Sequence, residues 1–202
     1  MVEKYSKNFY SWCYKYVGPV ITLFRPIELI GKENLIEGAA LVCSNHSAMI
    51  DPFLIGIAFG DENHIHVIAK IELFRIPVIS FLLKKMGMIS VDRSINDVNS
   101  VKNSLTYLKN GEKVVIFPEG TRRMKLDVAA VKSGAVKLAE RAKVPILPVF
   151  VPRKKPYFKK SKIVIGKPYF IEKLKEKRHP DDYHKLAEEL MYNIQSLGTE
   201  KL

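Results

Sequence analysis

Residues 39–60 read AALVCSNHSAMIDPFLIGIAFG, and this stretch shows the strand–turn–helix pattern that the rest of the chain repeats. A mostly apolar run (39–44) is followed by a polar turn, and Asp51-Pro52 then opens a second apolar run that ends at Gly60. Asp is favoured at a helix cap and Pro in the first helical turn. The stretch therefore predicts a buried strand at 39–44, a turn, and a helix at 52–60.

The same strand-and-helix alternation continues on both sides. β-branched runs predict further strands at 26–31, 64–69, 87–91, 113–117, 145–150 and 162–166. Helical periodicity predicts helices at 73–85, 98–110, 128–142 and 181–197. This order is typical of an α/β domain whose central sheet is mixed but largely parallel and is flanked by helices. No repeat or low-complexity linker interrupts it, so residues 25–202 are expected to form one domain.

Composition limits the cellular context. The chain has 202 residues, 47% of them hydrophobic, which is enough for a sizeable core. Cys13 and Cys43 are the only cysteines and form no CxxC pair, so a reducing cytosolic compartment is expected. Charged residues interrupt the N-terminus before a signal-peptide core can form, and no uncharged apolar run approaches the roughly 18 residues of a membrane span.

Residues 1–24 form a separate segment in which aromatic side chains alternate with lysines. Aromatic bodies with polar tips, placed beside lysines, are typical of an amphipathic helix lying at a membrane interface. A helix packed on the domain is the alternative. Gly18-Pro19 is expected to bend or end the first helical piece.

The positive charge is concentrated near the C-terminus. The chain carries a formal net charge of +12, and the segment 152–178 holds eleven Lys and Arg against two Glu, a net charge of +9. Such a segment is either a solvated lysine-rich face or a contact surface for nucleic acid, an anionic bilayer or an acidic protein. Charge alone does not choose among these.

Polar residues follow three of the predicted strands, where sites form in open α/β sheets. SNHSAMID follows strand 39–44, Asp92-Arg93 follows strand 87–91, and FPEGTRR (117–123) begins at the end of strand 113–117. If the helix starts at Asp51, the turn can fold His46 back toward that carboxylate, which would fix the tautomer and leave the other ring nitrogen as a base. An aspartate cap beside an unrelated histidine is the alternative reading of this stretch alone.

Other signatures of catalysis or metal binding are weak. There is no GxSxG elbow, no GxxxxGK loop and no GxGxxG. His64 and His66 would share one face of a strand, as zinc ligands can, but the sequence supplies no convincing third ligand. We therefore interpret this pair as structural and expect no metal and no cofactor.

Four ordered blocks resemble the glycerolipid acyltransferase family, specifically the lysophosphatidic acid acyltransferases. Asn45-His46 and Asp51 match the family's NHx4D, and Gly87 through Arg93 resembles its arginine-ended second block. FPEGTR (117–122) matches the third block and VPILPV (144–149) the fourth. Ser90 and Arg123 depart from the usual pattern, where an aromatic residue and a serine are common. The match spans roughly residues 26–166.

The resemblance implies transfer of a fatty acyl group from a thioester, acyl-ACP or acyl-CoA, to the sn-2 hydroxyl of lysophosphatidic acid. His46 would be the general base and Asp51 its orienting partner. Arg93, Glu119, Gly120, Thr121 and Arg122 would bind the acceptor. The reaction would make phosphatidic acid for phospholipid synthesis at the cytoplasmic face of the cell membrane, with the enzyme attached peripherally or monotopically and no nucleic acid involved.

Three alternatives remain open from the sequence. One is an acyltransferase that acts on another lysolipid acceptor. A thioesterase would use the same His46–Asp51 pair with water as the nucleophile, although water needs no arginine clamp. A non-catalytic module could bind lipid or nucleic acid through the basic 152–178 segment, whose aromatic residues could stack on bases.

Overall fold

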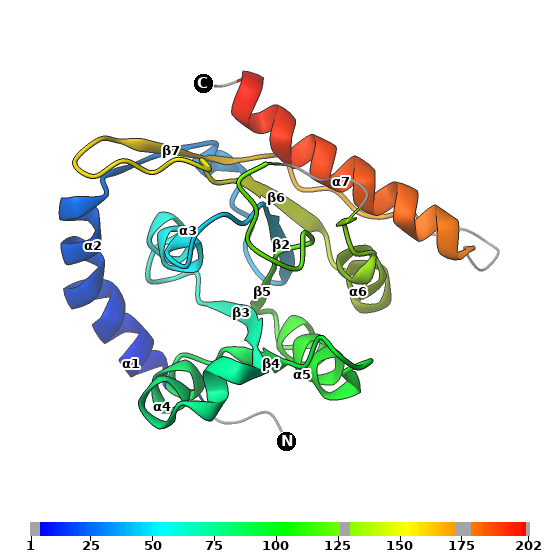
Figure 1. Cartoon of the computed structure of the whole chain (residues 1–202), viewed down its shortest axis with the longest axis horizontal. Coiled ribbons are helices and arrows are strands. Elements are labelled where there is room, and N and C mark those ends of the chain that lie inside the picture. Colours follow the sequence, from blue (N-terminus) through cyan, green and yellow to red (C-terminus); the bar gives the residue numbers. More distant parts are fainter. Residues whose placement is uncertain (1–4, 126–129, 173–178, 201–202) are drawn as a thin grey trace.

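A seven-stranded sheet forms the centre of the molecule (Figure 1). The computed structural model describes residues 5–125, 130–172 and 179–200. All seven predicted strands are present, in the spatial order β1-β7-β6-β2-β5-β3-β4. Their bounds are β1 Ile27–Ile30, β2 Ala40–Ser44, β3 Ile65–Lys70, β4 Ile89–Val91, β5 Lys113–Ile116, β6 Ile146–Phe150 and β7 Ser161–Ile165.

The sheet is largely parallel, as the alternation predicted. Every adjacent pair of strands is parallel except β6 and β7, which run antiparallel. Because β2, β3, β4, β5 and β6 are parallel, their carboxyl ends meet at one edge of the sheet. Residues that directly follow β2, β4, β5 and β6 therefore gather at that edge, which we call the carboxyl edge.

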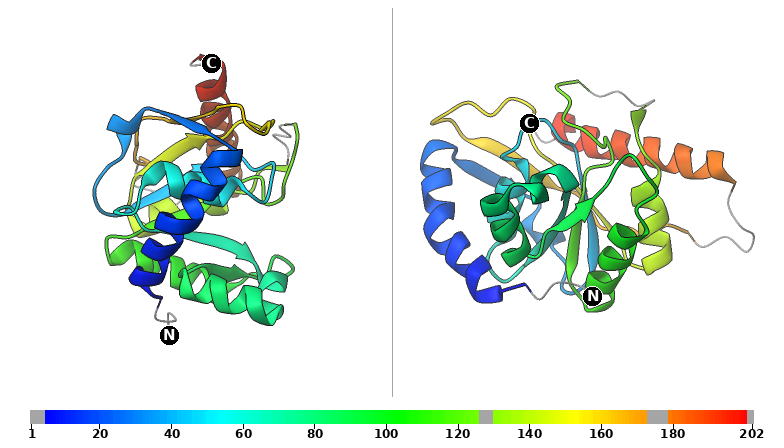
Figure 2. Two further views of the ribbon diagram at one scale, coloured as in Figure 1. Left: turned by 90° about the vertical axis from the view of Figure 1, so that its left-hand side faces the viewer. Right: turned by 60° about the horizontal axis from the view of Figure 1, so that its bottom comes forward.

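Helices cover both faces of the sheet (Figure 2). On one face lies α3 (Asp51–Phe59), with the N-terminal helices outside it; on the other lie α5 (Val98–Lys109), α6 (Gly134–Ala142) and α7 (Pro180–Glu200). A 3₁₀ turn (Ile71–Arg75) and α4 (Pro77–Lys85) connect β3 to β4. The predicted helix 128–142 is shorter than expected, since α6 begins at Gly134. Residues 126–129 lie outside the described part.

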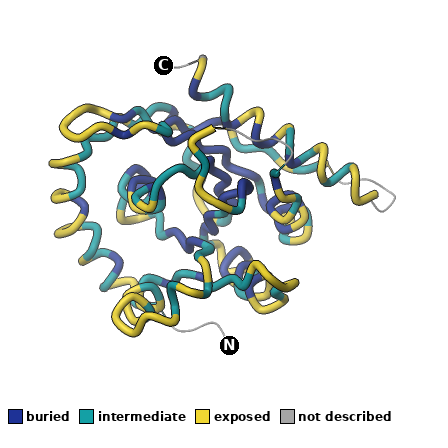
Figure 3. Tube along the Cα trace, in the orientation of Figure 1, coloured by how far each residue is buried: buried dark blue, intermediate teal, exposed yellow. Residues whose placement is uncertain are grey.

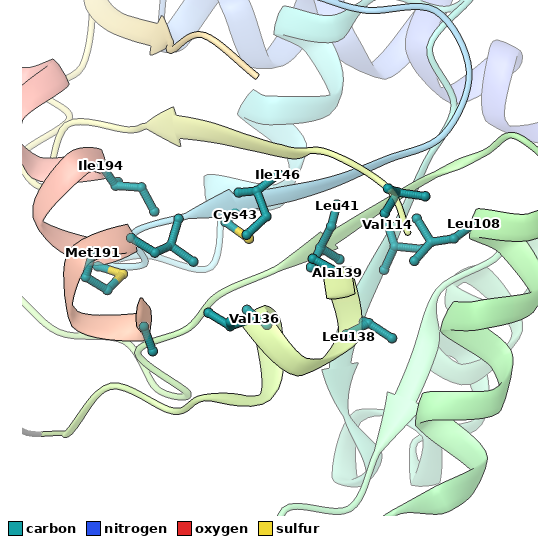
Figure 4. Close-up of a cluster of buried hydrophobic side chains, with 14 of the residues drawn as sticks. Leu41, Cys43, Leu108, Val114, Val136, Leu138, Ala139, Ile146, Met191 and Ile194 are labelled. Atoms are coloured by element: carbon teal, nitrogen blue, oxygen red, sulfur yellow. The ribbon is translucent and has the colours of Figure 1, made fainter. Parts of the chain in front are cut away.

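The core alternates along the strands with period two. In β2, Leu41 and Cys43 pack with α6 and α7 on one face (Figure 4), whereas Ala40 and Val42 pack with α3 on the other. All five residues of β2 are fully buried, because helices cover both sides. The burial map shows the same pattern, with the buried residues concentrated in the sheet and on the inner helix faces (Figure 3).

The N-terminal segment is helical from Lys7 to Phe24. It consists of α1 (Lys7–Trp12), a π-helical turn (Cys13–Val17) and α2 (Gly18–Phe24). Gly18-Pro19, expected to bend or end the first helical piece, does not end it, because the π-helical turn continues directly into α2. Pro19 falls in the first turn of α2, where its missing N–H costs little, and the π-turn before it absorbs the irregularity.

Within the described residues, no helix combines the length and the apolar character that crossing a bilayer requires.

Candidate functional site

The turn after β2 brings His46 and Asp51 together. His46 Nδ1 lies 2.9 Å from Asp51 Oδ2, and that oxygen also accepts hydrogen bonds from the backbone N–H of Ser47 (2.7 Å) and of Ala48 (2.8 Å). Asp51 is the first residue of α3, and its side chain points back into the turn instead of capping the helix. The predicted pairing geometry is thus present, and the alternative of a simple helix cap is not.

The second oxygen of Asp51 pairs with a lysine that the sequence analysis assigned to the basic segment. Lys155 Nζ lies 2.8 Å from Asp51 Oδ1 and donates to Ser47 Oγ at 2.7 Å. Burial alone would raise the pKa of the Asp51 carboxyl, but hydrogen bonds from His46, Ala48 and Lys155 hold that pKa below its ordinary value. Asp51 is therefore an ionised carboxylate at neutral pH.

The same contacts argue against Ser47 as a nucleophile. Its Oγ accepts from Lys155 and donates to the carbonyl of Arg153 at 3.2 Å. Lys155 Nζ donates to this hydroxyl and pairs with Asp51, so it does not serve as the base that would activate a serine nucleophile. Ser47 is a structural part of the turn.

His46 is fixed on its other side by Phe117, the first residue of the FPEGTR block. The two rings stack with centroids 4.1 Å apart and an interplanar angle of 19°. The backbone N–H of Arg123 donates to the His46 carbonyl at 2.8 Å, so the third block lies directly against the first. The imidazole keeps 15% of its surface exposed, and with Nδ1 bound to Asp51, Nε2 is the nitrogen left to take a proton.

The predicted acceptor residues of the third block divide into two groups. Thr121 and Arg122 are exposed. Glu119 is 1% exposed and forms an ion pair with Arg153, with 2.8 Å between Oε1 and Nη2. Glu119 is therefore held by Arg153, which also donates to the carbonyl of Arg123.

Gly120 joins this loop to Arg93. Its φ of +67° lies in the left-handed region that glycine adopts readily, and its carbonyl accepts a hydrogen bond from Arg93 Nη1. The arginine after β4 and the loop after β5 are thus in contact, as expected for residues at one edge. The guanidinium groups of Arg93 and Arg122 carry forked donors suited to a phosphate.

Three residues of the site were missed from the sequence. Arg153 and Lys155 read as members of a basic surface, and Phe117 as the end of a strand. Their signal was position, because Phe117 directly follows β5, and Arg153 and Lys155 lie three and five residues after the end of β6.

The His64–His66 pair lies elsewhere, under the N-terminal helix. His66 Nδ1 lies 2.8 Å from the carbonyl of Gly87 and Nε2 lies 3.1 Å from Glu112 Oε2, while His64 Nε2 lies 3.1 Å from the carbonyl of Met86. Three of the four ring nitrogens of the pair thus lie within 3.1 Å of a protein oxygen. Across residues 5–125, 130–172 and 179–200, no cluster of three or more His, Cys, Asp or Glu side chains is arranged to hold a metal ion.

The geometry supports one type of chemistry best. A neutral histidine oriented by a carboxylate can take a proton from a hydroxyl or a water, and the adjacent arginines can hold an anionic group of the molecule that carries it. Comparison with known proteins agrees with this reading. The family model described as Acyltransferase matches residues 26–152, which include every residue of the site except Arg153 and Lys155.

The chain belongs to the acyltransferase family.

Two relatives within this family are named as 1-acyl-sn-glycerol-3-phosphate acyltransferases. The chain is 34% identical over 165 residues to the 1-acyl-sn-glycerol-3-phosphate acyltransferase of Bacillus subtilis, covering 79% of this chain and 81% of that protein. It is 31% identical over 165 residues to a probable 1-acyl-sn-glycerol-3-phosphate acyltransferase of Mycoplasma genitalium, covering 72% of this chain and 61% of that one.

A solved structure has a similar fold. The crystal structure of the 1-acyl-sn-glycerophosphate (LPA) acyltransferase PlsC from Thermotoga maritima aligns with a TM-score of 0.65 and 23% sequence identity. The alignment covers 95% of this acyltransferase and 78% of the Thermotoga chain. The fold-class prediction, an α/β domain with a largely parallel sheet, is therefore confirmed, and so is the predicted family.

Proposed function

We propose that this acyltransferase moves a fatty acyl group from a thioester to the sn-2 hydroxyl of 1-acyl-glycerol-3-phosphate, making phosphatidic acid for phospholipid synthesis. The observation that carries the proposal is the His46–Asp51 pair, held at 2.9 Å directly against the FPEGTR loop. The names of the Bacillus and Mycoplasma relatives support the choice of acceptor.

The proposed reaction needs no nucleophile from the protein. His46 Nε2 takes the proton of the acceptor hydroxyl as its oxygen attacks the thioester carbonyl, and Asp51 stabilises the imidazolium that forms. Collapse of the tetrahedral intermediate breaks the carbon–sulfur bond, and the imidazolium returns the proton to the departing thiolate. The products are the ester and a free thiol, and His46 is neutral again.

Arg93 and Arg122 are the proposed phosphate ligands. Both side chains are exposed at the carboxyl edge, and Arg93 already contacts the loop that carries Arg122. Gly120 and Thr121 would line the acceptor site with their backbone and hydroxyl. Glu119 would act indirectly, since its buried ion pair with Arg153 fixes the loop that presents them.

We also propose that the enzyme attaches to the cytoplasmic face of the membrane. The N-terminal helices turn Tyr10, Gly18 and Ile21 toward the domain and expose an apolar stripe at spacings of three and four residues on the other side. The stripe consists of Trp12, Tyr16, Val20 and Leu23, whose exposed fractions run from 52% to 67%. Exposed apolar side chains at this spacing are typical of a helix that lies in a lipid interface.

Helix α4 extends the apolar surface. None of its residues is buried, and its Val78 (72% exposed) and Phe81 (58% exposed) face solvent. The backbone N–H of Ser6 donates to the carbonyl of Lys85 at 3.0 Å, so the start of α1 is joined to the end of α4. Lysines of the 152–178 segment that remain exposed, such as Lys159 and Lys160, would add attraction to anionic lipid.

One experiment tests the activity and separates the alternatives. Purified protein is incubated with acyl-ACP or acyl-CoA of several chain lengths and with a panel of lysolipids, and both thiol release and ester product are followed by mass spectrometry. We expect phosphatidic acid to form only with 1-acyl-glycerol-3-phosphate, and His46→Ala to reduce its formation by at least about 100-fold, as loss of a positioned base does. Thiol release without an ester would identify a thioesterase, and another esterified lysolipid would correct the acceptor.

A further inference from the structure

The structure assigns Lys155 as a positioning residue of the catalytic pair: its buried ammonium neutralises Asp51 and thereby keeps His46 unprotonated, in the form that acts as a base. The inference deepens the proposed function and rests on it for the catalytic role of His46. The effect on the His46 imidazole itself can be measured without any substrate.

The ammonium of Lys155 is built into the site. Its side chain is 2% exposed and that of Asp51 is 0% exposed, so water screens the 2.8 Å contact little. The second hydrogen bond, to Ser47 Oγ, ties the ammonium to the residue that follows His46. Lys154, which directly precedes Lys155 in the sequence, is exposed and provides a natural control.

Charge balance explains why the lysine matters. A buried carboxylate with no other cation nearby favours the imidazolium form of its histidine partner, because opposite charges attract strongly at low dielectric. Here Asp51 already receives a full positive charge on Oδ1, while His46 is bound to Oδ2. A second cation on the same carboxylate meets repulsion from the first, so the neutral imidazole is favoured.

Other charged residues lie on the elements packed against His46. Glu119, a carboxylate on the loop after β5, is neutralised by its ion pair with Arg153. Arg123 contacts His46 through its backbone N–H, and Arg93 is directed to the Gly120 carbonyl. Asp51 is the charged side chain in contact with a ring nitrogen of His46, and Lys155 is the cation paired with it.

The test is a titration of the histidine Cε1–Hε1 signals by NMR in the full-length protein. The signal of His46 is identified by its loss in His46→Gln and is followed in the wild type, Lys155→Met, Lys155→Arg and Lys154→Met. We expect Lys155→Met to raise the pKa of His46 by about one pH unit or more, as removal of a like charge at this range does. Lys155→Arg, which keeps the charge, and Lys154→Met should both leave that pKa near the wild-type value.

A lysine that only clasps the turn would give another result. In that case Lys155→Met would loosen the fold but leave the pKa of His46 within about 0.3 pH units of the wild type, and the inference would be wrong. In acyl-transfer assays the acid limb of the kcat/KM profile should move by the same amount as the NMR pKa. A protein whose NMR pKa moves but which transfers no acyl group would support the role of Lys155 and contradict the proposed function.

Removing one partner of a buried ion pair can prevent folding. Lys155→Gln, which is neutral but keeps a donor for Asp51, then replaces Lys155→Met, and amide dispersion in the ¹⁵N spectrum reports folding. If neither neutral variant folds, the test is a measurement of proton exchange at the lysine side chains of the wild-type protein. The Nζ–Hζ signal of Lys155 should show ammonium protons that exchange far more slowly than those of Lys154, and equally fast exchange at the two positions would overturn the inference.

Discussion

The side-chain amide of Asn45 continues the hydrogen-bond ladder between β2 and β6 one step beyond the strands. Its Nδ2 donates to the carbonyl of Val151 at 2.7 Å, and its Oδ1 accepts from the N–H of Val151 at 2.9 Å. Asn45 is fully buried and directly precedes His46. Strand-like hydrogen bonding thus extends to Asn45, the residue that directly precedes the proposed base. It fixes the loop after β2 relative to the loop after β6.

Replacement of Asn45 by Ala should destabilise the protein. The substitution leaves a buried N–H and a buried carbonyl of Val151 without partners, and each orphaned group costs about 1–3 kcal/mol. We expect the free energy of unfolding in urea to fall by about 2–4 kcal/mol. Asn99→Ala, on the exposed side of α5, is the control and should change it by less than about 0.5 kcal/mol. Equal effects of the two substitutions would mean that the ladder extension contributes nothing.

Replacement of Asp51 by Asn should remove both activity and acid-sensitive stability. Turnover should fall by at least about 100-fold, because the amide cannot stabilise the imidazolium. The pKa of Asp51 is lowered in the folded state, so its contribution to stability is present above the unfolded pKa of about 3.9 and is lost as the pH falls through the folded value.

The wild type should therefore exceed Asp51→Asn in unfolding free energy at pH 7, and the gap should narrow below about pH 4. The exposed Asp181→Asn serves as the control and should match the wild type in turnover and in unfolding free energy at neutral pH. A gap that stays constant from pH 7 to pH 3 would show that Asp51 is not ionised in the folded protein.

Arg122→Ala and Arg93→Ala should weaken binding of the acceptor and spare the donor. Loss of a hydrogen bond to a charged group costs about 1.5–3 kcal/mol, so we expect the KM for 1-acyl-glycerol-3-phosphate to rise by roughly 10-fold or more. The KM for the thioester should change by less than about twofold. Arg141→Ala, an exposed arginine on α6, is the matched control. Equal rises in both KM values would contradict the phosphate assignment.

His64 should make folding sensitive to mild acid. Burial, followed by the nearby His66, lowers the pKa of His64 to about 4, while hydrogen bonding to Met86 and the Glu112 carboxylate act in the opposite direction. A histidine whose pKa is lowered by folding contributes stability above its unfolded pKa of about 6.5 and loses that contribution as the pH falls toward 4. His64→Gln keeps a donor for the Met86 carbonyl and cannot titrate.

The difference in unfolding free energy between wild type and His64→Gln should therefore change by up to about 1.4 kcal/mol per pH unit between pH 6.5 and pH 5. The measurement is urea unfolding at several pH values. The exposed His184→Gln should show no such change relative to the wild type. A flat difference for His64→Gln would place the folded pKa near the unfolded one.

Membrane attachment should depend on the apolar stripe of the N-terminal helices. The double substitution Val20→Glu with Leu23→Glu should weaken binding to anionic vesicles by at least 10-fold, roughly, because each change removes apolar burial and adds a repelled charge. Val98→Glu with Tyr192→Glu makes the same change in charge at exposed apolar positions on the opposite helices and is the control.

Vesicle binding is measured by co-sedimentation, and its salt dependence separates the apolar contact of the N-terminal helices from the electrostatic attraction of the lysines. High salt should weaken wild-type binding only partly, since it screens the lysines and leaves the apolar contact. Deletion of residues 1–24 should weaken binding to the vesicles more than high salt weakens binding of the wild type. Vesicle binding by the truncated protein as strong as that of the full chain would show that the segment does not anchor the protein and that the basic residues do.

The sequence by itself determined the strands and the edge of the sheet at which the proposed site lies. Hydrophobic runs of strand length separated by helical periods specify a parallel sheet, because each run must be buried on both faces. Asp51-Pro52 specified the start of α3 to within a residue, since local backbone preferences act there. The His46–Asp51 pairing followed from the same local geometry.

Only the tertiary structure decided which basic residues belong to the site. Arg153 and Lys155 lie more than one hundred residues from Asp51 in sequence, and nothing in their neighbourhood separates them from the exposed Lys154. Alternation after β6 turns two of these three side chains inward, toward buried carboxylates supplied by the loops after β2 and β5. The sequence reports where charge is concentrated, whereas the partner of each charge depends on which strand ends become neighbours in the folded sheet.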